Sequence, residues 1–252
     1  MTEATTYFAP DSKVINRPIW REALWGADYL ALKTSTVYYG FGVPRGDKSA
    51  VIVVPGFLGT DHYLTELYLW LWRIGYKPFA SGIGWNRECL DQLTQRLIKT
   101  IEKAYSTTGK PVHLIGHSLG GILSRSAAVQ NTEKVASVIA LGSPFRGIRS
   151  HPLVQFSADR VRDDILKRNP EKPNCYTGRC DCNAVKALNT DIPAETMQTA
   201  IYTKTDGIVD WNSCVSVDKS SNFEVTGTHI GLVINPQVYR LIGKRLKLKT
   251  KV

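Results

Sequence analysis

The sequence predicts an α/β protein with a doubly wound, mostly parallel sheet covered by helices on both faces. Short apolar runs typical of buried strands alternate with longer segments in which leucine and isoleucine recur at helical spacing. Near-continuous apolar strands indicate a parallel sheet, because both of its faces are buried. The chain has 252 residues, is 43% hydrophobic and contains 20 glycines. We therefore expect one α/β domain over residues 1–252 with a sizeable core.

The predicted elements follow the chain in order. Strands are expected at 50–54, 77–82, 112–115, 135–141, 199–203 and 222–225, and helices at about 61–74, at about 89–106, after residue 118 and after Asn235-Pro236. Residues 1–48 are rich in tryptophan and tyrosine. They are expected to form either an edge hairpin and helix packed on the core or part of the wall around a site entrance.

The segment Gly116-His117-Ser118-Leu119-Gly120 follows an apolar strand and precedes a helix of small residues. In this context G-x-S-x-G is the pattern of a nucleophile elbow, a strained turn that presents a serine between a strand and a helix. Glycine is needed on both sides because a side chain there would collide where strand and helix cross. The pattern predicts acyl-transfer chemistry with Ser118 as the nucleophile.

A serine hydroxyl needs a base within hydrogen-bond reach and an acid that orients the base. Of the five histidines, His229 follows the last expected strand, where a doubly wound sheet delivers its final loop to the carboxyl edge. We predict that it is the base. His113 and His117 are expected to be packed or solvated, His62 to cap a helix or lie at the rim, and His151 is a candidate for the entrance.

The acid is expected from the strand before that one. Asp206 ends the strand at 199–203 and its short extension, and Gly207 then lets the chain turn away. We predict that Asp206 accepts the imidazole N–H and stabilises the imidazolium. Asp210, one short step further on, is expected to be a solvated or capping turn residue.

Two backbone N–H donors are needed to hold the oxyanion of the reaction. Leu119 supplies one by the construction of the elbow. The second is expected after the strand at 50–54, where the glycine-flanked loop Pro55-Gly56-Phe57-Leu58-Gly59-Thr60 begins. Phe57 is the predicted donor.

Taken together, these motifs resemble those of the small bacterial lipases and carboxylesterases of the α/β-hydrolase superfamily, over about residues 49–245. Such lipases commonly carry His-Gly-x-x-Gly-Thr-Asp in the oxyanion loop, and here Pro55 stands in place of the histidine. The segments around Asp206 and His229 resemble the family's acid and histidine loops, and the chain order Ser118, Asp206, His229 is the order of the family. The resemblance implies ester hydrolysis through an acyl-enzyme.

Two other functions are compatible with these residues. An acyltransferase or thioesterase uses the same triad and differs only in the acceptor of the acyl group. A non-catalytic binding protein on this fold is the alternative from another class, and the complete set of catalytic residue types argues against it.

Residues at about 145–195 exceed the length that a crossover needs, so we expect a small lid or cap over the carboxyl edge. A helix that simply packs on the core is the alternative. Three cysteines, Cys175, Cys180 and Cys182, lie in this segment, and Cys214 follows the acid loop. Their spacing does not fit zinc, whereas a disulfide to Cys214 is compatible with the sequence.

The remaining features concern partners and location. The net charge is +10, and the most concentrated basic run lies at 244–251, at the end of the helix expected after Asn235-Pro236. This position favours helix-dipole complementarity and solubility over nucleic-acid binding. No metal or organic cofactor is expected, and the expected substrate is a small-molecule or lipid ester, with transient contact with a lipid surface. No apolar run of spanning length and no signal peptide are present, so a cytoplasmic location is the default expectation, with secretion after leader removal as the alternative.

Overall fold

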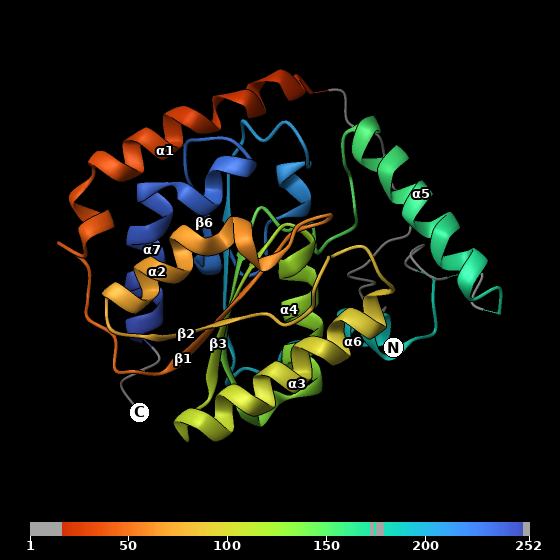
Figure 1. Cartoon of the computed structure of the whole chain (residues 1–252), viewed down its shortest axis with the longest axis horizontal. Coiled ribbons are helices and arrows are strands. Elements are labelled where there is room, and N and C mark those ends of the chain that lie inside the picture. The colour runs from red at the N-terminus through yellow and green to blue at the C-terminus, as the bar shows by residue number, and fades with distance from the viewer. Residues whose placement is uncertain (1–16, 172–173, 175–178, 249–252) are drawn as a thin grey trace.

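The computed structural model describes residues 17–171, 174 and 179–248. Its centre is a six-stranded sheet with the strand order β2-β1-β3-β4-β5-β6, and all neighbouring strands are parallel (Figure 1). The strands are β1 Ala50–Val54, β2 Lys77–Ala80, β3 Val112–His117, β4 Val135–Leu141, β5 Met197–Tyr202 and β6 Asn222–Glu224. The prediction of a doubly wound parallel sheet is confirmed.

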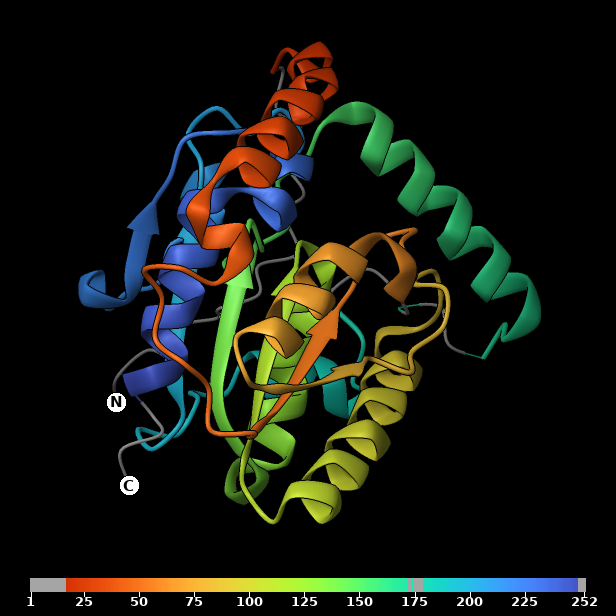
Figure 2. The ribbon, with the colours of Figure 1, turned by 60° about the vertical axis from the view of Figure 1, so that its left-hand side comes forward.

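Helices cover both faces of the sheet (Figures 1 and 2). One face carries α1 Trp25–Thr34, α2 Thr65–Arg73 and α7 Pro236–Leu248, and the other carries α3 Leu90–Thr108, α4 Leu119–Gln130 and α6 Asn183–Leu188. The remaining long helix, α5, spans Pro152–Arg168. Short 3-10 helices are η1 Ile19–Leu24, η2 Thr36–Tyr39, η3 Asp61–Leu64, η4 Thr132–Lys134, η5 Trp211–Ser213, η6 Lys219–Ser221 and η7 Ile230–Ile234.

The core consists of two apolar layers separated by the sheet. Alternate residues of a strand point to opposite faces, so Val51 and Val53 join the layer under α2 and α7, whereas Ile52 and Val54 join the layer under α3 and α4. The helices contribute residues at helical spacing, such as Leu93 in α3, which is fully buried. This burial fixes the sheet and hence the edge at which its loops meet.

Within the described part of residues 1–48, helices replace the expected edge hairpin. Residues 17–48 contain η1, α1 and η2 and no strand, so that part of the prediction is wrong; residues 1–16 lie outside the described residues. Residues 19–34 contain three alanines and three leucines, which favour helix over strand. Leu32 of α1 packs into the core, and α1 lies against η7.

The segment at about 145–195 divides into two parts. Ala184 and Leu188 of α6 are buried against α3 and α4, so α6 is part of a core layer. In α5, Val161 and Ile165 are buried against Cys89 and Phe57. The part of this segment that lies against the predicted oxyanion loop is therefore α5.

The elbow depends on close approach of backbone to backbone. A Cβ on Gly116 would overlap the carbonyl group of Gly120, and a Cβ on Gly120 would overlap the carbonyl oxygens of Val54 and Pro55. Helix α4 therefore crosses β1 and β3 at a distance that only glycine allows. This contact sets the position of Ser118 relative to the loop after β1.

Replacing Gly120 with Ala should lower the free energy of unfolding by about 3 kcal/mol, since the added methyl group meets fixed backbone atoms. Gly26 in α1 is the matched control, because a Cβ there meets nothing within 4 Å. Gly26→Ala should be neutral or stabilising by up to about 1 kcal/mol. Urea unfolding of both variants measures the difference, and equal midpoints would contradict the crowding at Gly120.

Candidate active site

Ser118 occupies the turn between β3 and α4. Its backbone has φ 51° and ψ −123°, a strained conformation for a residue with a side chain. Its N–H donates to the carbonyl oxygen of Leu141 at the end of β4, at 2.8 Å. The hydroxyl is therefore presented at the carboxyl edge of the sheet, and Leu119 begins α4 beside it.

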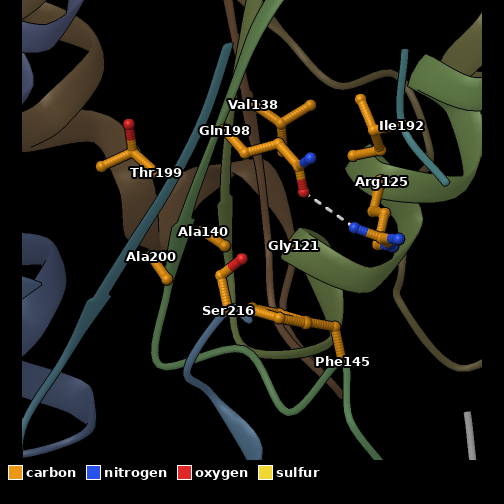
Figure 3. A pocket seen from close by; sticks show the side chains of 10 residues that line it. All are labelled: Gly121, Arg125, Val138, Ala140, Phe145, Ile192, Gln198, Thr199, Ala200 and Ser216. Atoms are coloured by element: carbon orange, nitrogen blue, oxygen red, sulfur yellow. Dashed lines mark hydrogen bonds between the residues drawn. The ribbon is translucent and has the colours of Figure 1, made fainter. Parts of the chain in front are cut away.

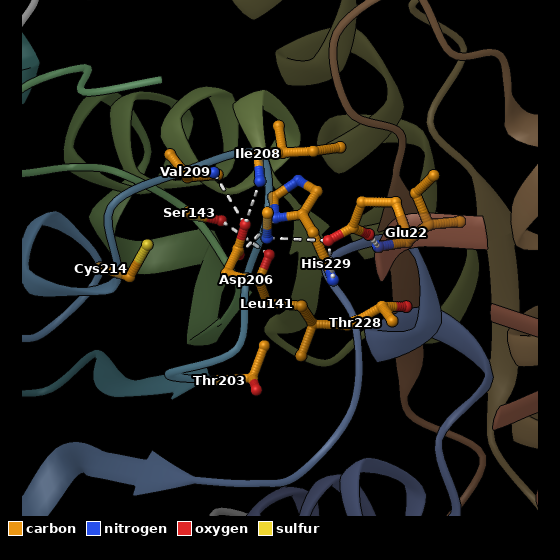
Figure 4. A network of polar contacts seen from close by, with 12 residues as sticks. Glu22, Leu141, Ser143, Thr203, Asp206, Ile208, Val209, Cys214, Thr228 and His229 are labelled. Carbon is orange, nitrogen blue, oxygen red and sulfur yellow. Dashed lines mark hydrogen bonds and ion pairs between the residues drawn. The ribbon is translucent and has the colours of Figure 1, made fainter. Parts of the chain in front are cut away.

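Asp206 and His229 form a buried pair at the same edge. Asp206 lies in the acid loop (residues 203–210), and His229 lies in the histidine loop (residues 225–230). Nδ1 of His229 lies 2.6 Å from Oδ2 of Asp206, and both residues are at most 2% exposed (Figure 4). Because a carboxylate accepts, Nδ1–H is the donor, which leaves the lone pair of Nε2 to accept a proton.

The carboxylate of Asp206 is held by its own loop. Oδ1 accepts hydrogen bonds from the N–H groups of Ile208 at 2.8 Å and Val209 at 2.7 Å. Asp210 instead caps η5 by accepting from the N–H of Asn212. Of the two aspartates, Asp206 is therefore the one that contacts His229.

Asp210 also lies beside two cations. Its carboxylate oxygens are 3.7 Å from the guanidinium groups of Arg17 and Arg149. These ion pairs and the hydrogen bond to Asn212 satisfy the buried carboxylate of Asp210 without a contact to His229.

Two glycines bring the serine turn and the histidine loop together. A Cβ on Gly142, the residue after β4, would lie 3.0 Å from Nδ1 of His229. A Cβ on Gly56 would lie 3.0 Å from Cβ of Ser118. The loop after β1 therefore approaches the serine turn, and the loop after β4 approaches the histidine loop, without a side chain on either glycine.

The electrostatics of His229 follow from its neighbours. Burial alone would lower its pKa, but the Asp206 carboxylate and the more weakly acting Glu22 carboxylate outweigh burial, so the pKa of His229 is raised above its usual value. The imidazolium form is therefore stabilised. Activity that needs neutral His229 should fall as the pH decreases through this raised pKa.

The predicted oxyanion loop is tied to residues 85 and 86. The N–H of Leu58 donates to the carbonyl oxygen of Asn86, and the N–H of Asn86 donates to that of Gly59, both at 2.9 Å. The side-chain amide of Asn86 donates to the carbonyl oxygen of Pro55 at 2.7 Å. Leu58 has a positive φ of 58°, so these bonds hold an unfavourable turn.

His117 connects the oxyanion loop to the histidine loop. Its Nε2 lies 3.0 Å from the carbonyl oxygen of His229, which can only accept, so Nε2 carries the proton. Burial lowers the pKa of His117 to about 3, so the ring is neutral and Nδ1 accepts from the Tyr63 hydroxyl at 2.8 Å. The same hydroxyl accepts from the N–H of Gly56 at 2.5 Å.

These three hydrogen bonds connect the N–H of Gly56, through Tyr63 and His117, to the carbonyl oxygen of His229. The sequence analysis did not predict them. His117 was expected to be merely packed or solvated, and Tyr63 was not considered. The one feature of the sequence that could have indicated these hydrogen bonds is position, because Tyr63 lies shortly after Thr60-Asp61 and His117 directly precedes Ser118. Tyr63 and Asn86 support the loop at Gly56 and at Pro55, through the two hydrogen bonds given above.

The remaining histidines lie outside these contacts. His113 is buried in β3 with Nδ1 2.8 Å from Oγ of Ser137. His151 caps α5 by accepting from the N–H of Leu153, and His62 is exposed in η3.

Three of the described cysteines, Cys180, Cys182 and Cys214, form no disulfide. Cys214 is buried and its Sγ donates to the carbonyl oxygen of Asp210, so the disulfide considered between the insertion and Cys214 is not formed. Cys180 and Cys182 also form no disulfide, and Cys175 lies outside the described residues. Over the described ranges, no group of three or more His, Cys, Asp or Glu residues is arranged to hold a metal ion.

A separate pocket lies between α4 and the strands β4 and β5 (Figure 3). Within it, Nη1 of Arg125 donates to Oε1 of Gln198 at 2.8 Å. The lining residues are Gly121, Arg125, Val138, Ala140, Phe145, Ile192, Gln198, Thr199, Ala200 and Ser216. Ser118, Asp206 and His229 are not among them, so this pocket is distinct from the candidate site.

The parallel sheet with its elbow, acid loop and histidine loop has the α/β-hydrolase fold. Solved structures with the same fold include a mature lipase of Bacillus licheniformis, with TM-score 0.55 and 15% identity over 81% of this chain and 94% of that one. A soluble variant of monoglyceride lipase from Saccharomyces cerevisiae gives TM-score 0.57 and 13% identity over 83% of this chain and 91% of that one.

Sequence comparison gives matches to parts of the chain. Residues 87–159 match the family described as a PGAP1-like alpha/beta domain. A triacylglycerol lipase of Burkholderia plantarii is 28% identical over 156 residues, which are 58% of this chain and 41% of that protein. A triacylglycerol lipase of Pseudarthrobacter phenanthrenivorans is 30% identical over 129 residues, 48% of this chain and 38% of that protein. The matched part is therefore about two fifths of the length of these relatives.

No helix among the described residues has the length and apolar character needed to cross a membrane.

Replacing Tyr63 with Phe should lower the free energy of unfolding by about 1–3 kcal/mol, because the N–H of Gly56 and Nδ1 of His117 lose their shared partner. Tyr76→Phe is the matched control, since the buried Tyr76 hydroxyl has no hydrogen-bond partner among the described residues. Thermal and urea unfolding of the two variants measure the effect. Equal stability of Tyr63→Phe and wild type would refute the chain of hydrogen bonds.

Proposed function

We propose that the protein is a serine hydrolase of carboxylic esters, an esterase or lipase that acts through an acyl-enzyme. The observation that carries the proposal is the buried hydrogen bond of 2.6 Å between His229 and Asp206, at the sheet edge where the strained Ser118 turn lies. Relatives described as triacylglycerol lipases and neighbours described as lipases support the same reaction class.

In the first half of the proposed reaction, Nε2 of His229 removes the proton of the Ser118 hydroxyl as its oxygen attacks the ester carbonyl. The backbone N–H groups of Phe57 and Leu119 stabilise the oxyanion. The imidazolium of His229 then protonates the leaving alcohol, and the acyl group stays on Ser118. Asp206 stabilises the imidazolium through the Nδ1–H hydrogen bond.

In the second half, water attacks the acyl-enzyme. His229 takes a proton from the water, a second oxyanion forms in the same place, and Ser118 leaves as a hydroxyl when His229 returns the proton. The acid product departs, and the enzyme is regenerated. Neither half requires a metal ion or an organic cofactor.

The proposed substrates are lipid or small-molecule esters. Support comes from the surroundings of the oxyanion loop, where Phe57 packs with Val161 and Ile165 of α5. Leu58 and Trp85 are exposed beside it, and the indole N–H of Trp85 donates to the carbonyl oxygen of Leu58. Apolar side chains of this kind favour an acyl chain near the serine.

Replacing Ser118 with Ala should lower kcat for nitrophenyl ester hydrolysis by about 10⁴-fold or more, because the nucleophile is lost. Circular dichroism should match that of the wild type. Product analysis of the wild type with water, an alcohol and an acyl thioester as competing reactants tests the acyltransferase and thioesterase alternatives. Activity of Ser118→Ala within tenfold of wild type would rule out the mechanism.

The two aspartates provide a matched pair of variants. Asp206→Asn should lower kcat by about 10³- to 10⁴-fold, since the charge that stabilises the imidazolium disappears. Asp210→Asn should lower kcat less than about tenfold, because an asparagine can still cap η5. Both are assayed on one ester, and the reverse ranking would assign the acid to Asp210.

A further inference from the structure

Glu22, in η1, is a buried carboxylate next to the Asp206–His229 pair (Figure 4). It is 5% exposed. Its Oε1 accepts from the N–H groups of Gly207 at 2.9 Å and His229 at 3.1 Å. Its Oε2 accepts from the N–H of Ile230 at 2.9 Å. Among the described residues its partners are these amides and not a cation.

These three donors belong to two loops. Gly207 directly follows Asp206, and the N–H of His229 belongs to the base itself. One carboxylate therefore bridges the acid loop, at the residue after Asp206, and the histidine loop, at His229 itself. The approach is close, since a Cβ on Gly207 would lie 3.1 Å from Oε1 of Glu22.

Burying a carboxylate is unfavourable unless hydrogen bonds satisfy it. Within the part of the chain that the structure describes, the three backbone N–H groups satisfy Glu22 and no cation forms an ion pair with it, so its negative charge is not cancelled there. That charge lies beside the imidazole that becomes positive during the proposed reaction, and it acts in the same direction as Asp206 on the pKa of His229.

We propose that Glu22 is a positioning residue of this site: it holds the acid and histidine loops together and adds negative charge beside the imidazolium of His229. This inference rests on the function proposed above. It assigns to the N-terminal segment, which is formed by η1 and α1, a role in the reaction that requires no contact with substrate.

A second carboxylate in the same segment provides a control. Oδ2 of Asp28, in α1, accepts from the N–H of Thr228 at 3.3 Å and from its hydroxyl at 3.2 Å. Asp28 thus holds the histidine loop but bonds neither His229 nor the acid loop. Among the described residues, the titratable groups around His229 are Asp206 and Cys214 after β5, His117 from β3, Glu22 from η1 and Asp28 from α1.

The test compares wild type, Glu22→Gln, Glu22→Asp and Asp28→Asn by kcat and kcat/KM on a nitrophenyl ester from pH 5 to 9. Glu22→Gln removes the charge, so the pKa of His229 falls and the acid limb of kcat/KM should move about 0.5–1 pH unit lower. Its kcat should fall about 10- to 100-fold through misplacement of the loops. Asp28→Asn should leave the acid limb in place.

Glu22→Asp separates charge from position. It keeps the charge and withdraws the carboxylate by one methylene group, so the acid limb should stay near that of the wild type while kcat falls. Wild-type kcat in Glu22→Asp, an unmoved acid limb in Glu22→Gln, or failure of Glu22→Gln to fold at 10 °C would each overturn the proposal. The last two would mean that Glu22 only supports the fold.

The pKa of His229 measured by NMR with labelled histidine keeps this test independent of turnover. If wild type hydrolysed no ester, the proposed function would fail, but a lower pKa of His229 in Glu22→Gln than in wild type would still support the role of the Glu22 charge. An unchanged pKa would reject it whatever the activity.

Discussion

Two carboxylates and an imidazole are buried together at the carboxyl edge of the sheet, and the surrounding structure depends on satisfying them. Asp206 receives the Nδ1–H of His229 and two backbone N–H groups of its own loop. Glu22 receives three backbone N–H groups from the acid and histidine loops. Because a buried carboxylate without donors is strongly unfavourable, these hydrogen bonds fix the paths of both loops. The N-terminal segment thereby becomes part of the site.

The pKa values of two histidines at this edge, His117 and His229, are shifted in opposite directions. Their rings lie 4.7 Å apart, centre to centre. His229 faces a carboxylate, which raises its pKa, whereas His117 faces a hydroxyl and a carbonyl oxygen, and burial lowers its pKa to about 3. His229 is therefore suited to take up a proton, and His117 serves as a neutral bridge between the oxyanion loop and the histidine loop.

The parts of the molecule that the sequence predicts are those coded by local pattern. Apolar runs predict the strands, and the glycines at 116 and 120 are required by backbone crossing within a few residues of Ser118. Chain order and the ends of predicted strands also suffice to choose Asp206 and His229 as neighbours.

The parts that escaped prediction depend on distant contacts. Glu22 lies 185 residues from Gly207 and 207 residues from His229, and no local pattern distinguishes it from any other helical glutamate. The Tyr63–His117 hydrogen bond joins residues 54 apart. Of the two alternatives for residues 1–48, the edge hairpin is absent from residues 17–48, where the residues between the aromatic side chains form helices instead.

The most direct test of the central claim is mass spectrometry of the protein after reaction with a fluorophosphonate ester. Activation of Ser118 by the His229–Asp206 pair predicts one adduct per chain, on Ser118. An adduct on another residue, or none under conditions in which the protein hydrolyses esters, would contradict it.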